Sequence, residues 1–205
     1  MIKLYHFWES GNSREVRIVL AEKGISFASE VVNIMKGETR TPEFLAMNPF
    51  GKVPVLVDGD LAIYESNIIN EYLEDRFPEP RLMPAEAAGR ARVRQIIHWA
   101  NAHIHANLGP VLLETLLKPE DARDKAMIEQ RTGAIEGALA RIEAWLAAGP
   151  YLAGAFTLAD AALAPHVAVL GMIGIEPGER LPRFTAWVAR LQARPSFAES
   201  AGPPA

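Results

Sequence analysis

Over residues 1–77, hydrophobic residues occur in two patterns, one typical of strands and one typical of helices. Short apolar runs predict strands at Lys3–Phe7 and Phe27–Asn33. Between them, apolar residues recur at helical spacing and predict a helix at Ser13–Lys23, which Gly24 ends. Since a strand, a helix and a second strand connect by a right-handed crossover, we expect the two strands to be parallel neighbours.

The pattern continues with a short helix and a hairpin. A proline in the first turn predicts a helix at Thr41–Met47. Strands at Val55–Val57 and Leu61–Tyr64 follow, joined by an Asp-Gly turn, and an amphipathic helix begins at Ser66. This order of elements resembles a thioredoxin-like sheet, and the fold class expected for residues 1–77 is therefore α/β.

Beyond residue 77 the pattern becomes entirely helical. Three prolines in eight residues indicate a linker at residues 78–86, and an all-helical domain is expected over residues 87–200. Its predicted helices are Ala87–Leu117, Lys125–Ala148, Thr157–Gly171 and Pro182–Arg194. Their apolar stripes require close packing against one another. The last five residues, Ala201–Ala205, are expected to be disordered.

One helix start in the second domain carries a strong local signal. Thr157 and Asp160 form a Thr-x-x-Asp capping box, which fixes where a helix begins. This motif specifies fold and not chemistry. Pro165, inside the same helix, predicts a kink.

Composition narrows the function classes. The 205 residues are 49% hydrophobic and 22% charged, with a net charge of −4 and no long basic run, which argues against nucleic acid as a partner. The chain has no cysteine, so disulfides, cysteine metal sites and a cysteine nucleophile are excluded. No apolar run is long enough to span a bilayer, and the first residues read as a strand and not as a signal peptide. A cytoplasmic protein without a membrane partner is expected.

Two dipeptides suggest a binding site for a peptide-like anion. Val53 and Pro54 stand at a strand entrance, where a cis peptide bond would leave the backbone of Val53 free to pair with an extended ligand. Glu65 and Ser66 open a helix whose first amides favour a carboxylate, and the Ser66 hydroxyl adds a donor. Each dipeptide alone is also ordinary strand punctuation or helix capping.

Together, in this order and after Asn-Pro-Phe-Gly, these residues resemble the glutathione site of the glutathione transferases. The Ser-x-x-Ser-x-x-Val-Arg-Ile spacing is similar to that of the serine-type classes (phi, zeta and theta), and the resemblance implies that the Ser10 hydroxyl holds the glutathione sulfur as a thiolate. A free thiol has a pKa of about 8.5, so a donor there favours the reactive form. Ser13 and Asn12 remain alternatives, with Ser13 also readable as an N-cap.

The glycyl carboxylate of glutathione requires cations. The resemblance to the phi-class loop assigns Arg40 to that end, although Thr39 replaces a histidine of that loop. Lys52, just before Val53, is a second candidate donor. Both are also readable as solvated surface cations.

The acceptor site for an electrophile is expected between the two domains, with Trp8 as a wall and His105 at its edge. The Ile-His-x-x-x-x-Pro segment around His105 is similar to that of the bacterial beta class, whose histidine lines the active site. His98 and His103 are interpreted as packing residues. No pair on this helix has metal-ligand spacing, so no metal is expected.

The resemblance covers Lys3 to about Phe197. It implies a glutathione transferase with glutathione as co-substrate and no other cofactor, acting on a small hydrophobic electrophile. It also implies a homodimer in which Phe50 docks into the partner subunit, unless Phe50 only anchors its own loop. Two rival functions are a maleylacetoacetate-type cis–trans isomerase and a non-catalytic binding protein. The isomerase would have Ser-Ser-Cys where this chain has Ser10-Gly-Asn12.

Overall fold

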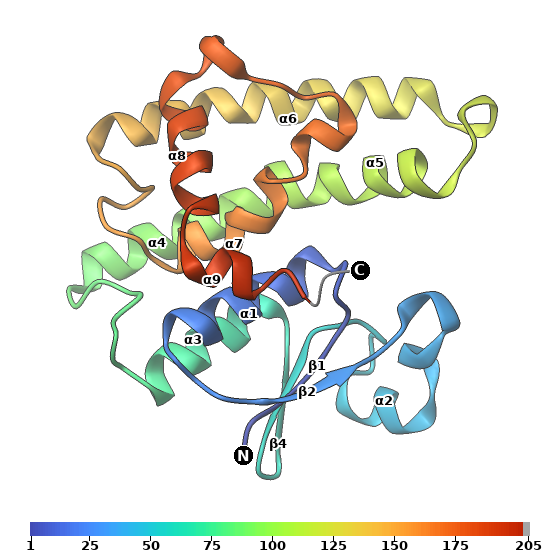
Figure 1. Ribbon diagram of the computed structural model, residues 1–205, viewed down its shortest axis with the longest axis vertical. Coiled ribbons are helices and arrows are strands. Elements are labelled where there is room, and N and C mark those ends of the chain that lie inside the picture. Colours follow the sequence, from blue (N-terminus) through green and yellow to red (C-terminus); the bar gives the residue numbers. More distant parts are fainter. Residues whose placement is uncertain (203–205) are drawn as a thin grey trace. The chain divides into compact units, whose positions relative to one another are not determined.

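The computed structural model describes residues 1–202, and these fall into two compact units (Figure 1). One unit joins Met1–Leu82 to the segment that begins at Arg194, and the other is Met83–Ala193. The C-terminal segment thus belongs with the N-terminal residues by contact. The division predicted at residues 77 and 87 stays a prediction, and residues 203–205 of the predicted disordered tail lie outside the described part of the chain.

The first unit is built on a four-stranded mixed sheet. Its strands are β1 (Lys3–His6), β2 (Ala28–Val31), β3 (Val55–Asp58) and β4 (Leu61–Tyr64), in the order β2-β1-β3-β4. β1 and β2 are parallel, while β3 is antiparallel to both β1 and β4. The parallel pair, the hairpin and the thioredoxin-like fold class are all confirmed.

The register of the sheet brings apolar residues together at its centre. Leu4 on β1 lies opposite Leu56 on β3, and both are completely buried. Leu56 in turn lies opposite Ile63 on β4. Burial of such side chains is worth about 25 cal/mol per Å² of apolar surface, so this layer contributes strongly to the stability of the unit.

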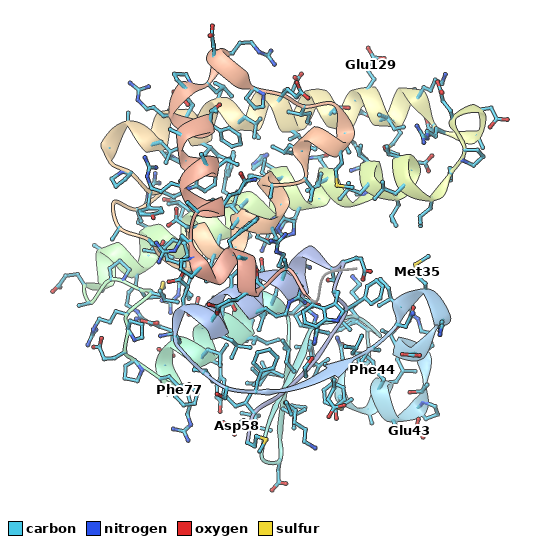
Figure 2. All side chains as sticks on the ribbon, viewed as in Figure 1. Met35, Glu43, Phe44, Asp58, Phe77 and Glu129 are labelled. Carbon is cyan, nitrogen blue, oxygen red and sulfur yellow. The ribbon has the colours of Figure 1, made fainter. Side chains whose placement is uncertain are left out.

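Helices cover the sheet of the first unit. They are α1 (Gly11–Glu22), α2 (Pro42–Met47), α3 (Ser66–Arg76) and α9 (Pro195–Glu199), with 3-10 turns at Ile34–Lys36 and Glu38–Arg40. α1 packs against both α3 and α9. Thr41 caps α2 by accepting from the Phe44 N–H at 3.3 Å. Phe44, which is labelled in Figure 2, is buried with Val32 and Val55. The sequence predicted the start of α2 from its proline, whereas it predicted no helix at Pro195–Glu199.

The second unit is helical, as predicted. Its helices are α4 (Ala87–Ala100), α5 (Ala106–Leu117), α6 (Lys125–Trp145), α7 (Leu158–Val167) and α8 (Pro182–Gln192), with 3-10 turns at Glu120–Ala122, Leu146–Ala148, Leu170–Ile173 and Gly178–Arg180. α5 packs along α6, and α7 packs on α4 and α8. Every residue of α7 is buried, so this helix is the core element of the unit.

The single helix predicted over Ala87–Leu117 is interrupted by a π-helical turn at Asn101–His105. The interruption lies just before Pro110, which has no N–H and so leaves the carbonyl of Ala106 without its helical donor. Arg131 supplies a substitute donor, with its guanidinium 2.9 Å from that oxygen. A side chain distant in the sequence therefore provides the hydrogen bond that this carbonyl lacks. Hydrophobic periodicity alone did not reveal the interruption.

The capping box at the start of α7 is confirmed in both directions. Thr157 accepts from the Ala159 N–H at 3.3 Å, and Asp160 accepts from the Thr157 N–H at 3.0 Å. Asp160 also accepts from the Leu152 N–H at 3.1 Å and from the indole N–H of Trp187 at 3.0 Å. The box thus ties α7 to α8 as well as starting the helix, whereas the kink at Pro165 stays a prediction.

Candidate functional site

The loop after β1 ends in the N-cap of α1, and the capping residue is Ser10. Its side-chain oxygen accepts a hydrogen bond from the Ser13 N–H at 3.2 Å, so α1 begins at Gly11, two residues before the predicted start. The interpretation of Ser13 as an N-cap is therefore wrong. Ser13 lies in the first turn of the helix, where its Oγ accepts from the Phe7 N–H at 3.5 Å.

The three candidate thiol-binding residues differ in what they can offer a ligand. Ser13 is fully buried, Ser10 is half-buried and Asn12 is exposed. A hydroxyl carries one donor and two acceptor positions. Because the cap uses an acceptor position of Ser10, its O–H proton stays available, and Ser10 can cap α1 and donate to an anion at the same time.

The first turn of α3 is the second part of the candidate site. Glu65 precedes it with φ +69°, a strained conformation for a residue with a side chain, and its carbonyl accepts from the Ile68 and Ile69 N–H groups at 2.9 Å. Glu65 is exposed, whereas Ser66 is buried. The remaining first-turn amides and the helix dipole favour an anion here, as the sequence predicted.

The segment that leads into β3 contains the predicted cis bond between Val53 and Pro54. Just before it, the buried Asn48 side chain holds the turn together. Its Nδ2 donates to the Lys52 carbonyl at 2.7 Å, and its Oδ1 accepts from the Phe50 N–H at 3.0 Å. The backbone that carries Val53 is thus fixed by a side chain that the sequence analysis did not single out.

Arg40 lies beside the same turn. Gly51 has φ +60°, and a Cβ there would come within 2.8 Å of an Arg40 guanidinium nitrogen and 2.9 Å of the Thr39 carbonyl. Glycine is therefore required for this close approach. Arg40 therefore lies next to Gly51, the residue before Lys52. The side chains of Arg40 and Lys52 are both exposed at this corner of the unit, beside the turn that leads into β3.

Trp8 is held within the first unit by Arg17. Arg17 is only 3% exposed and donates to the Trp8 carbonyl at 2.9 Å, the Phe7 carbonyl at 3.3 Å and the Ser200 carbonyl at 2.9 Å. Its guanidinium carbon also lies 4.6 Å from the centre of the Trp8 ring, which is a cation–π contact. The role of Trp8 at an acceptor site stays a prediction.

His6 extends the Arg17 network to the sheet. Its Nδ1 lies 3.1 Å from an Arg17 nitrogen, and its Nε2 lies 2.7 Å from Ser29 Oγ. Burial, followed by the charge of Arg17, lowers the pKa of His6 to about 4, so the ring is neutral at pH 7, with Nδ1 as acceptor and Nε2–H as donor. Sequence reasoning missed this support of the Ser10 loop, although Arg17 is part of the Val-Arg-Ile motif.

His105 packs against another histidine of the helical unit. It stacks on His166 with the ring centres 3.7 Å apart, and its Nε2 is buried without a hydrogen-bond partner among the described residues. Burial, followed by repulsion from His166, lowers the pKa of His105 to about 2. The ring is therefore neutral and packed against His166 in the helical unit, and its place at the edge of an acceptor site stays a prediction.

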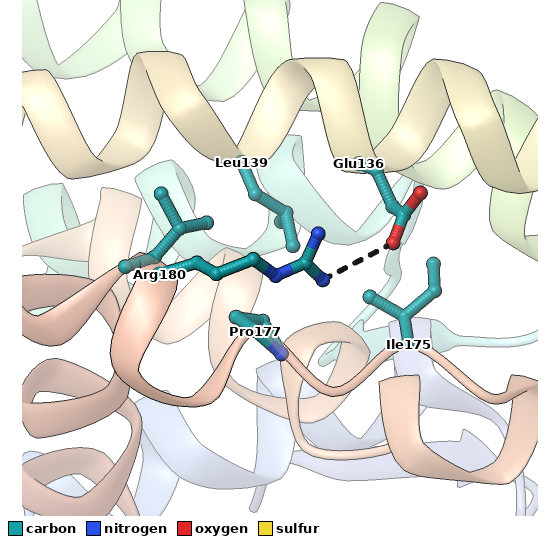
Figure 3. Close-up of a pocket in the computed structure, with 6 residues that line it drawn as sticks. Glu136, Leu139, Ile175, Pro177 and Arg180 are labelled. Carbon is teal, nitrogen blue, oxygen red and sulfur yellow. Dashed lines mark ion pairs between the residues drawn. The ribbon is translucent and has the colours of Figure 1, made fainter.

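His98 and His103 are exposed, with the His103 ring 5.0 Å from that of Trp99, so their interpretation as packing residues stays a prediction. Elsewhere in the helical unit, a small pocket lies between α6 and the turn at Gly178–Arg180, lined by Leu139, Ile175 and Pro177 (Figure 3). An exposed ion pair closes it, with Glu136 and Arg180 3.5 Å apart. It contains no predicted site residue.

Residues 1–202 lack a metal-binding cluster and a membrane-spanning helix. This part of the chain holds no group of three or more histidine, cysteine, aspartate or glutamate side chains that would suit a metal ion. It also holds no helix with the length and hydropathy needed to cross a membrane.

Comparison with known proteins identifies the family. The family models "Glutathione S-transferase, N-terminal domain" and "Glutathione S-transferase, C-terminal domain" match residues 1–75 and 104–195. Glutathione S-transferase 3 of Zea mays is 36% identical over 203 residues, covering 96% of this chain and 91% of the relative. The chain belongs to the glutathione S-transferase family of enzymes.

Two further relatives bear on the class. Maleylpyruvate isomerase of a Ralstonia species is 38% identical over 172 residues, covering 81% of each chain. The solved theta-class glutathione S-transferase of Xanthomonas axonopodis pv. citri, with glutathione bound, aligns with a TM-score of 0.90 at 32% identity, covering 99% of this chain and 98% of its own.

Proposed function

We propose that this enzyme activates the thiol of glutathione and transfers it to a small hydrophobic electrophile, a reaction suited to detoxification in the cytoplasm. The observation that carries the proposal is Ser10, whose cap leaves its proton available at the start of α1. A hydroxyl donor and the first amides of a helix stabilise a thiolate more than a thiol. Reactivity then rises without a protein base.

Binding of glutathione is proposed to use the first turn of α3 and the strand edge before β3. Ser66 and the helix amides receive the γ-glutamyl carboxylate, and Glu65 faces the ammonium group of the same residue. The backbone of Val53 pairs with the cysteinyl unit as an added strand would. Arg40 and Lys52, exposed at one corner, suit the glycyl carboxylate.

The test of the Ser10 assignment is the thiol pKa of bound glutathione, read from thiolate absorbance against pH. Ser10→Ala is expected to raise that pKa and slow conjugation of a chloronitroarene, with little change in glutathione affinity, because it removes an interaction specific to the reactive state. Asn12→Ala and Ser13→Ala are the matched controls. If the thiol pKa shifts in either control variant and not in Ser10→Ala, the stabilisation of the thiolate belongs to the residue changed in that control.

A second experiment tests the ammonium contact. Glu65→Ala is expected to weaken glutathione binding by roughly 1.5–3 kcal/mol, the value of a hydrogen bond to a charged group. Calorimetry measures it directly. An unchanged affinity would remove Glu65 from the site.

Isomerisation of a maleyl acid is the second candidate function. The relative named maleylpyruvate isomerase favours it, whereas the Ser10-Gly-Asn12 sequence does not match the Ser-Ser-Cys of zeta-like isomerases. Turnover of maleylpyruvate that depends on glutathione, without conjugation of chloronitroarenes, would select it. The non-catalytic alternative requires glutathione binding with neither activity.

The proposal includes a homodimer anchored by Phe50. Its side chain is 59% exposed and touches Tyr64 edge-on, with the ring centres 5.9 Å apart. An exposed aromatic of this kind carries a large share of interface energy when it docks into a pocket. Phe50→Ala should shift sedimentation toward the monomer, and a wild-type protein that is monomeric at micromolar concentration would exclude the dimer.

A further inference from the structure

Two polar side chains of the first unit are buried without hydrogen bonds. Glu15 on α1 is fully buried and Asn70 on α3 is 1% exposed. Neither carboxyl oxygen of Glu15 and neither polar atom of the Asn70 amide has a partner of ordinary geometry in residues 1–202. Buried polar groups in native proteins are nearly always paired, because an unpaired one destabilises the fold. Unpaired polar groups of this kind therefore indicate a role other than stability.

Both residues are related to the first turn of α3, the candidate anion site. α1 packs against α3, and the Ser66 hydroxyl is close enough to Glu15 to favour its charged form, although the full hydrogen-bond geometry is not reached. Asn70 follows Ser66 by four residues and so lies on the same face of α3, one turn further along. Ser66 is the first residue of α3, so Glu15 approaches the first turn of α3 at Ser66.

The described surroundings of Glu15 contain no cation that would hold it ionised. Burial raises its pKa to about 8, and the Ser66 hydroxyl opposes this less strongly. The titratable groups of α1 itself and of the helices packed on it are Arg14, Arg17, Glu22, Glu71, Tyr72, Glu74, Asp75, Arg76 and Glu199. None of them is a cause of the shift. At neutral pH, Glu15 is therefore mostly the uncharged acid.

We propose that Glu15 is a positioning residue of the glutathione site and acts through Ser66. The proposal rests on the proposed function. When the ligand carboxylate binds, an uncharged Glu15 donates its O–H to Ser66 Oγ, so the Ser66 proton is left for that carboxylate. An ionised Glu15 would accept the Ser66 proton and place a negative charge behind the anion site, which weakens binding of the carboxylate.

The experiment uses S-methylglutathione, whose sulfur cannot titrate, and measures affinity by calorimetry at pH 6.5 and pH 9. Glu15→Gln keeps an amide donor and cannot ionise, so we expect wild-type affinity at pH 6.5. Between the two pH values, wild type should lose about 3- to 10-fold more affinity than Glu15→Gln, the value of one hydrogen bond. Titration of the ligand ammonium is common to both proteins and cancels.

Glu15→Leu and Ser66→Ala separate positioning from stability. Glu15→Leu should lose about 3- to 10-fold in affinity at pH 6.5 with an unchanged or higher Tm, because it removes the donor and leaves no unpaired polar group. When Ser66→Ala is added to wild type and to Glu15→Gln, the difference between their pH profiles should disappear. Glu129→Gln, on the exposed surface of α6 (Figure 2), is the control for loss of one negative charge and should match wild type.

The outcomes are distinguishable. Identical pH profiles for wild type and Glu15→Gln overturn the positioning role, whether or not Glu15→Leu folds, and leave the proposed function intact. A wild-type protein that does not bind S-methylglutathione at either pH overturns the proposed function, and this inference with it.

Discussion

Among residues 1–202, each unit has one completely buried carboxyl side chain, Glu15 or Asp160, and the two differ in their hydrogen bonds. Asp160 in the helical unit accepts hydrogen bonds from Leu152, Thr157 and Trp187 at 3.0–3.1 Å. Glu15 in the first unit has no completed hydrogen bond to the described residues. Burial raises the pKa of both, to about 6 for Asp160 and about 8 for Glu15.

The difference separates a structural carboxyl group from one that is available for another purpose. The acceptor positions of Asp160 are taken up by two backbone amides, a hydroxyl and an indole, so its burial specifies the fold. Glu15 contributes no such bond within the described part of its unit. A buried polar group that the fold does not use is the stronger candidate for a role in function.

The largest effect is expected for Asp160→Ala. It would leave the buried donors of Leu152, Thr157 and Trp187 without acceptors, and the free energy of unfolding should fall by roughly 3–5 kcal/mol. Denaturant unfolding measures this. Asp124→Ala is the matched control, since Asp124 caps the exposed start of α6 through the Met127 N–H at 3.0 Å, and should cost about 1 kcal/mol. Equal losses in the two variants would mean that burial of Asp160 adds nothing.

A second effect uses the stacked imidazoles of the helical unit. Burial lowers the pKa of His105 to about 2 and that of His166 to about 4, so the unfolded chain binds more protons than the folded one below about pH 6.5. The stability that the neutral rings contribute is present above pH 6.5 and is lost as the pH falls toward the folded pKa values. Asp160 titrates in the opposite sense, and a comparison of variants cancels its contribution.

His105→Phe keeps an aromatic ring in the stack and removes one of these titrations. Between pH 7 and pH 5, wild type should lose roughly 2 kcal/mol more stability than the variant. Denaturant unfolding at both pH values is the measurement. Parallel losses in the two proteins would show that His105 is not buried as a neutral ring.

Glu15→Leu tests the other half of the comparison and should have a smaller effect of opposite sign. Replacing an unpaired buried acid with an apolar side chain should raise the free energy of unfolding at pH 7 by roughly 1–2 kcal/mol. Because the folded pKa is raised, the contribution of Glu15 to stability is fully present below pH 4.5 and is lost as the pH rises through about 8. The advantage of the variant should therefore grow from pH 5 to pH 9, and a destabilised variant would show that Glu15 is satisfied after all.

Ser10 has a structural role and is also available to a ligand. Its Oγ accepts the capping hydrogen bond of α1, and the cap does not use the O–H proton on the same atom. Ser10→Ala should lower stability by about 1 kcal/mol, the usual value of a cap. Thr41→Ala removes the cap of α2 in the same unit and is the control. The two variants should match in thermal unfolding and differ only when bound glutathione is titrated.

The sequence predicted the elements that local chemistry determines. The parallel pair and the hairpin of the first unit, the helix start at Thr41-Pro42, the cis bond at Val53 and the Thr157–Asp160 box follow from short spacings, and all are present. The cap at Ser10 was missed because two serines three residues apart offer the same local signal. The candidate site was outlined from its motifs, but its assignments remain proposals.

Features that depend on residues distant in the sequence could not be predicted from local patterns. The carbonyl of Ala106, just after the π-helical turn, is paired with an arginine from another helix, which no periodicity shows. Glu15 is buried because α1 is covered by both α3 and α9, so this part of the helix has no polar face left for solvent. A charged residue among apolar neighbours reads as exposed until both covering helices are known.

The return of α9 to α1 has a consequence for synthesis on the ribosome. Arg17 depends on the carbonyl of Ser200, and Arg14 on the carbonyl of Phe197 at 3.0 Å, yet the whole helical unit is translated between them. At about 5–20 residues per second, the first unit waits roughly 5–20 s with this face of α1 uncovered. During that time a nascent chain offers an incomplete thioredoxin-like unit to chaperones, until the segment around α9 closes it.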